Sequence, residues 1–254
     1  MRELLIVRAG LVGYAEALRL QGGLAAARGA GEVADVALML EHPPVYTKGR
    51  RTTAAELPMG EDWYRAQGID VVETDRGGAV TYHGPGQLVA YPIMSLREMS
   101  VTSPAAPGRE AEEAAGMSVP DYVRRMELAM IDALGDHGVR AGIIDGLTGV
   151  WVGEVPPPAG DARKIGSIGV HISRGITTHG LAINVNNDLQ PFEWVVPCGI
   201  EACRMTSLTR ELGAEQDLDA FASTVARRLG DAYERRPVET PPEEILGSLA
   251  LEAA

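Results

Sequence analysis

The stretch from Ile165 to Asn184 constrains the fold most, because it has the pattern of a long antiparallel hairpin. Two runs rich in apolar and β-branched residues, Ile165–Ile172 and Ile176–Asn184, flank an Arg174-Gly175 pair. A short glycine-containing connection between two such runs is typical of strands joined by a tight turn. The sequence therefore predicts a chain organised around a β-sheet.

The rest of the chain adds more strands than helices. Helices are predicted at Tyr14–Arg28, at Asp62–Gln67, from Pro120 to Leu134 and from Leu218 to Leu229. Further strands are predicted at Leu4–Arg8, Val36–Leu40, Ile69–Glu73, Val80–His83, Leu88–Ile93 and Gly149–Val152. Because the two kinds of element do not alternate regularly, we expect an α+β fold with a mixed sheet flanked by helices.

One domain accounts for most of the 254 residues. We expect it to span residues 1–236, with insertions at about 101–117 and 154–162, where proline, glycine, alanine and acidic residues occur without periodicity. After Arg236 the chain is rich in proline, glutamate and alanine, so residues 237–254 are predicted to form a mobile tail.

Composition excludes several classes of protein. The formal net charge of -12 argues against nucleic-acid binding, which needs a basic face. The sequence has no run of about 18 apolar residues, so no membrane span is expected, and the apolar N-terminus is too short for a signal peptide. Two cysteines make no disulfide framework and fit a reducing compartment, so we expect a cytoplasmic protein.

Cys198 is the first candidate for chemistry. It stands between Pro197 and Gly199, a setting typical of an exposed turn, where a nucleophile could be reached. The alternative is an inert buried cysteine, the usual state of a free thiol. Cys203 follows five residues later, but a tetrahedral zinc site needs more ligands than this pair supplies, so no metal site is expected.

Two further segments carry candidate site residues. Four glycines lie between Arg76 and Gln87, and their backbone N–H groups could hold an anion or a carbonyl oxygen, although a pair of plain turns fits as well. Lys164 opens an apolar, glycine-spaced strand; a solvated lysine at the end of a loop is the alternative. His171 and His179 lack metal-ligand spacing and read as structural histidines.

Taken together, these segments resemble the octanoyltransferases of lipoate biosynthesis. The matching stretches are RGGAVTYHGPGQLVAYPI (Arg76–Ile93), GVWV (Gly149–Val152), KIGSIGVHISRGITTHGLAINVN (Lys164–Asn186), PCGI (Pro197–Ile200) and LEHPPVYTKGRRT (Leu40–Thr52). The likeness runs from about Leu4 to Leu212, and the combination of RGG-x-x-T-x-HGPGQ, K-I and PCG is highly specific.

The resemblance implies the fold of the biotin and lipoate protein ligases. It also implies transfer of an octanoyl or lipoyl group, as the first step of protein lipoylation. The donor would be acyl carrier protein, which bears the acyl group on phosphopantetheine, and no other cofactor is expected. The acceptor would be a lysine of lipoyl domains, those of 2-oxoacid dehydrogenase complexes and of the glycine cleavage H protein.

The same resemblance assigns the site residues. Cys198 would carry the acyl thioester, and Lys164 would lie beside it as the activating partner. Acyl-chain contacts would come from Arg76, Gly77, Gly78, Ala79, Val80, Thr81, Tyr82, His83, Ser167, Ile168, Gly169, Gly180, Leu181 and Ala182. Gly166-Ser167 stand where alanines are commoner in the family, and Lys48 replaces a usual apolar residue.

Two other functions remain open on the sequence. An ATP-dependent lipoate or biotin ligase would share the fold but need no nucleophilic cysteine, whereas a non-catalytic binder of acylated carrier domains would need neither Cys198 nor Lys164. Both proposed protein substrates are typically acidic, so docking would need a local positive rim. Candidates for it are Lys48, Arg50, Arg51, Arg76, Arg163 and Arg174.

Overall fold

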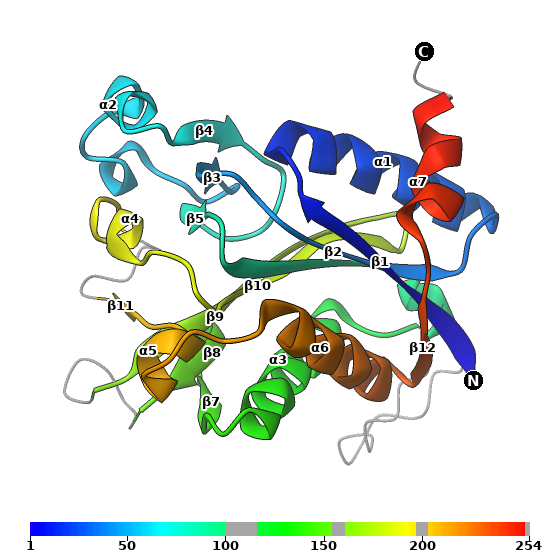
Figure 1. Cartoon of the computed structure of the whole chain (residues 1–254). Helices are drawn as coiled ribbons and strands as arrows, with labels where there is room; N and C mark the ends of the chain where they lie inside the picture. Colours follow the sequence, from blue (N-terminus) through cyan, green and yellow to red (C-terminus); the bar gives the residue numbers. More distant parts are fainter. Residues whose placement is uncertain (100–115, 154–160, 197–202, 252–254) are drawn as a thin grey trace, which may run out of the picture.

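A long mixed sheet runs through the molecule, and its strand order explains how distant segments meet. The computed structural model describes residues 1–99, 116–153, 161–196 and 203–251. Within these residues nine strands form one sheet in the order β12-β1-β2-β6-β10-β9-β8-β7, with β11 paired to β9 (Figure 1). The expected α+β class with a mixed sheet is confirmed.

In the central part of the sheet, the observed strand bounds lie close to the predicted ones. They are β1 (Arg2–Leu11), β2 (Asp35–Glu41), β6 (Gln87–Ile93), β7 (Ala141–Ile144), β8 (Leu147–Val152), β9 (Arg163–Ser173), β10 (Ile176–Asn184), β11 (Arg204–Met205) and β12 (Arg235–Glu239). A second sheet, in the order β4-β3-β5, is formed by β3 (Val45–Lys48), β4 (Asp70–Glu73) and β5 (Thr81–His83).

The predicted hairpin is confirmed as β9 and β10. Ser173 pairs with Ile176 across the turn, and both turn residues have positive φ, 53° at Arg174 and 87° at Gly175. That combination belongs to the two-residue turns whose twist matches antiparallel strands, and glycine adopts it without steric cost. The hairpin is central because β6 and β8 extend the sheet on its two sides.

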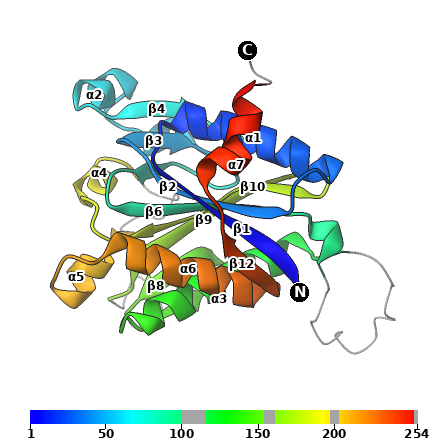
Figure 2. The same cartoon turned by 45° about the vertical axis from the view of Figure 1, so that its right-hand side comes forward.

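Helices cover both faces of this sheet (Figure 2). Those with bounds close to the prediction are α1 (Tyr14–Ala30), α2 (Glu61–Ala66), α3 (Val119–Asp136) and α6 (Leu218–Tyr233); the others are α4 (Gln190–Glu193), α5 (Leu208–Leu212) and α7 (Pro242–Leu251). The face under α3 and α6 buries the largest apolar cluster, and α1 covers the opposite face with a smaller one. A third cluster lies between the small sheet, α2 and α4.

Residues 237–254 were predicted to be a mobile tail, and for the described part, residues 237–251, the structure instead gives regular elements. The segment continues β12, which pairs in parallel with β1 from Arg2↔Arg235 to Ile6↔Glu239, and then forms α7. The nearby Arg235 makes a buried ion pair with Asp35 at 2.8 Å. Composition alone could not reveal this, because the strand depends on a partner more than 200 residues earlier.

The two predicted insertions lie mostly outside the described residues. Of the segment at 101–117, Gly116 and Met117 are described, and Met117 is buried in the large apolar cluster. Of the segment at 154–162, Asp161 and Ala162 are described, immediately before β9. The first segment therefore precedes α3 and the second separates β8 from β9. That the two segments are insertions stays a prediction.

Candidate active site

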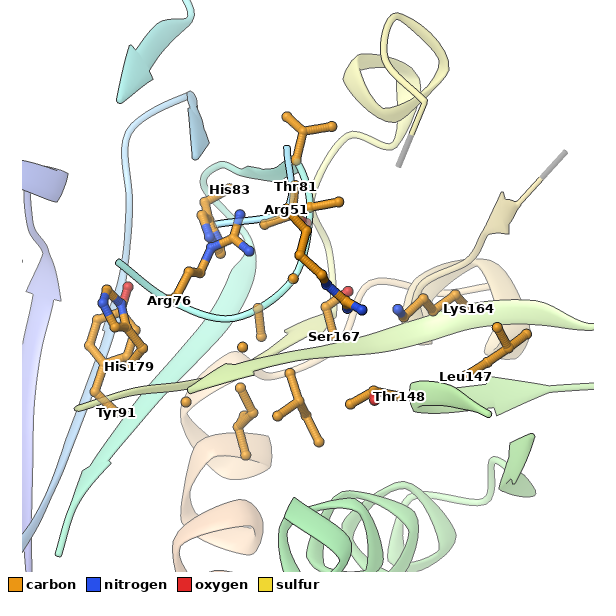
Figure 3. Close-up of a pocket in the computed structure, with 18 of the residues that line it drawn as sticks. Arg51, Arg76, Thr81, His83, Tyr91, Leu147, Thr148, Lys164, Ser167 and His179 are labelled. Atoms are coloured by element: carbon orange, nitrogen blue, oxygen red, sulfur yellow. The ribbon is translucent and has the colours of Figure 1, made fainter. Parts of the chain in front are cut away.

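A cavity of about 470 Å³ lies between the β9–β10 hairpin and the glycine-rich segment (Figure 3). Most of the predicted acyl-chain residues line it, together with the predicted catalytic Lys164. They are Arg76, Gly78, Ala79, Val80, Thr81, His83, Lys164, Ser167, Ile168, Gly169, Gly180, Leu181 and Ala182. Residues from α1, the segment after β3, β6, the start of β8 with the turn before it, and His179 of β10 complete the lining.

The hairpin forms one wall of the cavity. Ser167 pairs with Ala182, Ile168 with Leu181 and Gly169 with Gly180, so three successive rungs of the ladder face the same space. Glycine is needed at the last rung: a Cβ on Gly180 would lie 2.2 Å from the carbonyl oxygen of Ala90, and one on Gly169 would lie 2.8 Å from that of Gly77.

The opposite wall is the glycine-rich segment, held in place by Arg76. The guanidinium is buried and donates from Nη2 to Thr47 Oγ1 at 2.7 Å and from Nε to the same oxygen at 3.1 Å. The N–H of Gly77 donates to the carbonyl oxygen of Val170 at 3.0 Å, which ties this wall to β9. Arg76 thus fixes the wall as well as lining the cavity.

Lys164 lies at one end of the cavity, with Leu147 and Thr148 at the start of β8 beside it (Figure 3). The lysine is only 3% exposed, so the alternative of a solvated lysine is wrong. Its Nζ lies 5.4 Å from the centroid of the Trp151 ring. A buried ammonium facing the reacting space could stabilise a nearby anion or exchange a proton with a substrate.

The far end of the cavity is lined by rings. Tyr14 and His83 stack with centroids 6.0 Å apart, and Tyr91 and His179 meet edge to face at 6.2 Å. His42 lies behind them, 5.0 Å from Tyr14 and 5.5 Å from His83. Figure 3 shows Tyr91 and His179 at the end opposite Lys164.

Hydrogen bonds fix the tautomers of these histidines. His42 Nδ1–H donates to the carbonyl oxygen of Val12 at 2.7 Å, so its Nε2 accepts the Tyr91 hydroxyl proton at 2.7 Å. His179 Nε2–H donates to Asp75 Oδ1 at 2.7 Å. Burial lowers the pKa of His42 to about 4 and also lowers that of His179, although Asp75 opposes the second shift.

The remaining rings at this end are also held neutral. Burial lowers the pKa of His83 well below its ordinary value, and its Nδ1–H donates to Gln87 Oε1 at 2.7 Å. Burial raises the pKa of Tyr14 to about 12, although Arg76 lowers it. The far end is therefore uncharged at neutral pH, apart from Asp75 behind His179 and Arg76 in the wall.

Comparison with known proteins identifies the family. The model of the lipoyl protein ligase A/B catalytic domain matches residues 13–230. An octanoyltransferase of Solibacter usitatus is 43% identical over 234 residues, covering 92% of this chain and 94% of its own. One of Mycobacterium tuberculosis H37Rv is 45% identical over 217 residues, covering 85% and 81%. This chain belongs to the octanoyltransferases.

Solved structures agree with the fold of these octanoyltransferases. A bipartite lipoate protein ligase of an archaeal lipoylation system, from Thermoplasma acidophilum, superposes with a TM-score of 0.69 at 18% identity. The match covers 99% of this chain and 92% of the other. A lipoate-protein ligase A bound with ATP superposes with a TM-score of 0.64, covering 99% and 93%. These superpositions confirm the expected ligase-like fold, and the acyltransferase class follows from the octanoyltransferase relatives.

Two of the predicted site residues lie outside the cavity lining, and a third is not described. Gly77 and Tyr82 are not part of the cavity lining: Gly77 packs against β9, and the Tyr82 ring packs 5.6 Å from Tyr46 and 5.5 Å from Phe192. Cys198 falls outside the described residues. The described residue nearest before it, Val196, donates its N–H to the carbonyl oxygen of Glu56 at 3.0 Å.

Several lining residues of this octanoyltransferase escaped sequence reasoning. His179 was taken for a structural histidine, yet it lines the cavity with an Nδ1 that has no partner within the described part of the chain. Its place directly before Gly180 was a signal that could have found it. The others carried no comparable signal and are Tyr14, Arg51, Glu56, Tyr91, Gly146, Leu147 and Thr148.

Only some of the residues predicted to form the positive rim are exposed in the structure. Lys48 and Arg163 each form two ion pairs with carboxylates, and Arg76 is buried. The exposed members are Arg50, Arg51 and Arg174. Among the described residues no group of His, Cys, Asp or Glu is arranged to hold a metal ion, and no described helix is both long and apolar enough to span a membrane.

Proposed function

We propose that this protein transfers an octanoyl or lipoyl group from acyl carrier protein to a lysine of a lipoyl domain, through a thioester on Cys198. The observation that carries the proposal is a buried lysine at one end of a cavity whose size suits a medium-chain acyl group. An extended eight-carbon chain built from C–C bonds of about 1.5 Å is roughly 9 Å long, and the cavity of about 470 Å³ runs from Lys164 to the rings of the far end.

Chain connectivity supports Cys198 as the nucleophile. Val196 is held by Glu56, whose side chain lines the cavity and accepts the Val80 N–H at 3.0 Å. On the other side of Cys198, Met205 pairs with Lys164 as part of β11. Cys198 is the second residue after Val196, and two residues of chain span about 7 Å at most. The proposal therefore requires Cys198 to lie within that distance of Val196, at the Lys164 end of the cavity.

The first half-reaction moves the acyl group onto the enzyme. The Lys164 ammonium would stabilise the Cys198 thiolate, which attacks the thioester carbonyl of the acylated phosphopantetheine arm. The tetrahedral intermediate collapses, the new Cys198 thioester remains, and the phosphopantetheine sulfur leaves with a proton from Lys164. One thioester replaces another, so the step needs no ATP and no cofactor besides the donor's own arm.

The second half-reaction makes the amide. Lys164, now neutral, would take a proton from the incoming lysine ammonium, and the free amine attacks the Cys198 thioester. Collapse of the second intermediate forms the amide, releases the second proton of the amine to solvent and returns the Cys198 thiolate beside the Lys164 ammonium. Acceptors of this kind would be the lipoyl domains of 2-oxoacid dehydrogenase complexes and of the glycine cleavage H protein, in the cytoplasm.

Intact mass spectrometry tests the thioester. After mixing with octanoyl acyl carrier protein without ATP, the protein should gain one octanoyl group, and peptide mapping should place it on Cys198. Cys198→Ala should gain none. Cys203→Ser is the matched control, since Cys203 is a half-buried thiol with its Sγ 4.0 Å from Met205 Sδ, and it should still load. An ATP requirement, or an adduct on Cys203, would overturn the proposal.

Substitutions of Lys164 test its two roles separately. Lys164→Ala removes the charge, so the pH midpoint for alkylation of Cys198 by iodoacetamide should rise towards the ~8.5 of an ordinary thiol, and both half-reactions should slow. Lys164→Arg keeps a charge that cannot be given up at working pH. It should retain part of the low midpoint and some loading, yet pass little acyl group to the lipoyl domain. If Lys164→Ala changes neither midpoint nor loading rate, Lys164 has no part in catalysis.

A further inference from the structure

Trp151 stands opposite Lys164 on the neighbouring strand. The two residues pair across β8 and β9, directly after a register shift between Val150 and Trp151. A shift of this kind places an extra residue on one strand and re-aims the side chains next to it. As a result the Lys164 Nζ lies 5.4 Å from the centroid of the indole ring, within the range of a cation–π contact.

The surroundings leave the lysine little freedom. Lys164 and Trp151 are each 3% exposed, and the carbonyl oxygen of Lys164 accepts the N–H of Thr206 at 2.9 Å. Burial strengthens a cation–π contact, because water no longer competes for the ammonium. Trp151 is not one of the cavity-lining residues, so it is placed to act on a substrate only through Lys164.

The buried indole group carries a cost in folding stability that its packing alone does not explain. Its Nε1–H is buried and finds no hydrogen-bond partner among the residues that the structure describes. A buried donor without a partner is destabilising, and a purely apolar side chain would fill the same space without one. Tryptophan does, however, offer the aromatic face that attracts a cation most strongly.

Gly149 makes the room that the lysine occupies. It has φ of 118°, a conformation that side chains rarely adopt, and a Cβ there would lie 2.7 Å from Lys164 Cε and 3.2 Å from Nζ. Its N–H donates to Oε1 of the buried Glu127 on α3 at 2.9 Å. Arg124 pairs with the other oxygen of that carboxylate at 3.1 Å. The strand behind the lysine is thus fixed from α3.

We propose that Trp151 is a positioning residue, whose indole face holds the Lys164 ammonium at the reacting end of the cavity in the space that Gly149 leaves open. The inference rests on the proposed role of Lys164 in acyl transfer. It goes beyond that role by naming the groups that fix the position of the Lys164 ammonium. It predicts that the effects of substituting Trp151 and Lys164 on octanoyl loading depend on each other.

A double-mutant cycle tests this coupling. Trp151→Leu should slow the octanoyl loading of Cys198 by about 10-fold, the order expected for losing a buried cation–π contact. In a Lys164→Ala background the same change should have less than about a 2-fold effect, because the cation is already gone. Trp151→Phe keeps an aromatic face and should restore most of the loading rate. Effects that multiply independently, or a Trp151→Leu enzyme that loads at the normal rate, would overturn the proposal.

Two controls separate positioning from folding. Val150→Ala, one residue away in the apolar cluster under α3, should lower the melting temperature yet leave loading per folded molecule and the alkylation midpoint of Cys198 unchanged. Trp151→Leu should instead raise that midpoint, as Lys164→Ala does. If Val150→Ala reproduces the loss of loading and the raised midpoint, Trp151 acts through general packing and the inference fails.

A last measurement does not depend on the reaction. Pulse labelling with acetic anhydride and mass spectrometry reports how accessible the Lys164 amine is. Trp151→Leu should raise the labelling of Lys164 several-fold and Trp151→Phe should not. If the wild-type protein never loads Cys198, the proposed function fails, while this labelling still decides whether Trp151 holds the lysine; equal labelling in all three proteins would refute that hold.

Discussion

The two ends of the cavity are built on opposite electrostatic principles. At one end the Lys164 amino group lies in a nearly fully buried place, against the face of Trp151. At the other end burial lowers the pKa of His83 and of His179 and so favours their neutral forms, and it raises the pKa of Tyr14, whose phenol is neutral at pH 7 in any case. Exclusion of water therefore strengthens the electrostatic effect of a charge at the lysine end, and it disfavours the charged forms of the histidines at the other end.

This difference between the two ends would favour one orientation of a bound acyl group. The carbonyl of an acyl group develops negative charge as a nucleophile attacks it, so it belongs beside the cation. The hydrocarbon tail carries no charge and is best accommodated beside neutral rings and the apolar rungs of β9 and β10. A medium-chain acyl group would thus be oriented by the two ends as much as by the shape of the space.

The largest effect is expected at the charged end. Lys164→Met keeps the length and apolar stem of the side chain but removes the ammonium. Octanoyl transfer should fall about 1,000-fold, within the range for losing a proton-transfer group, while the free energy of unfolding stays unchanged or rises because a buried charge has gone. Turnover and urea unfolding measure the two quantities. Transfer within 10-fold of wild type would show that the two ends do not differ in the way described.

The neutral end should respond to acid. Unfolded His42 takes up a proton near pH 6.5, whereas the folded protein delays this until about pH 4, so stability falls as pH drops through that window. From pH 7 to pH 5 this histidine alone should cost about 2 kcal/mol, and His83 and His179 shift in the same direction.

Urea unfolding at several pH values checks this expectation. In His42→Gln the slope of stability against pH between pH 5 and 6 should be lower by about one proton, or ~1.4 kcal/mol per pH unit. The slope is compared within each protein, so a general loss of stability in the variant does not disturb the reading. An unchanged slope would mean that the histidines of this end are not held neutral.

A smaller effect is expected behind the lysine, at Glu127. Glu127→Leu leaves the buried N–H of Gly149 without its acceptor, which should cost about 2 kcal/mol of stability. Glu127→Gln can still accept that proton through its amide oxygen, so its cost should be smaller by about half. Thermal and urea unfolding compare the two. Equal losses would indicate that the Gly149 hydrogen bond does not hold the strand behind Lys164.

The smallest effect is expected at Tyr14. Its buried hydroxyl makes no hydrogen bond of standard geometry with the described residues, although Thr74 and Arg76 lie near enough to influence its pKa. Tyr14→Phe removes this hydroxyl and keeps the ring, so the free energy of unfolding should change by less than about 1 kcal/mol. A loss above ~2 kcal/mol in urea unfolding would show that the hydroxyl has a partner at this end.

Much of the fold could be predicted from the sequence because its elements carry local signals. The alternating runs around Arg174-Gly175 identified the hairpin, and the spacing from Pro120 to Leu134 identified α3. Strands β3 and β7, each of four residues, were missed, although the equally short β4 was predicted. Strand β12 was missed because Arg235–Glu239 looks polar until β1 pairs with it.

The candidate site divides in the same way. The sequence by itself determined the two walls of the cavity and the lysine at its end, since glycine-rich turns and Lys164 stand in contiguous motifs. Only the tertiary structure decided what surrounds them: Tyr14 comes from α1, Tyr91 from β6 and Trp151 from β8. Trp151 meets Lys164 through a register shift between β8 and β9. Such pairing depends on how strands pack across the whole sheet, and no local pattern in the chain encodes it.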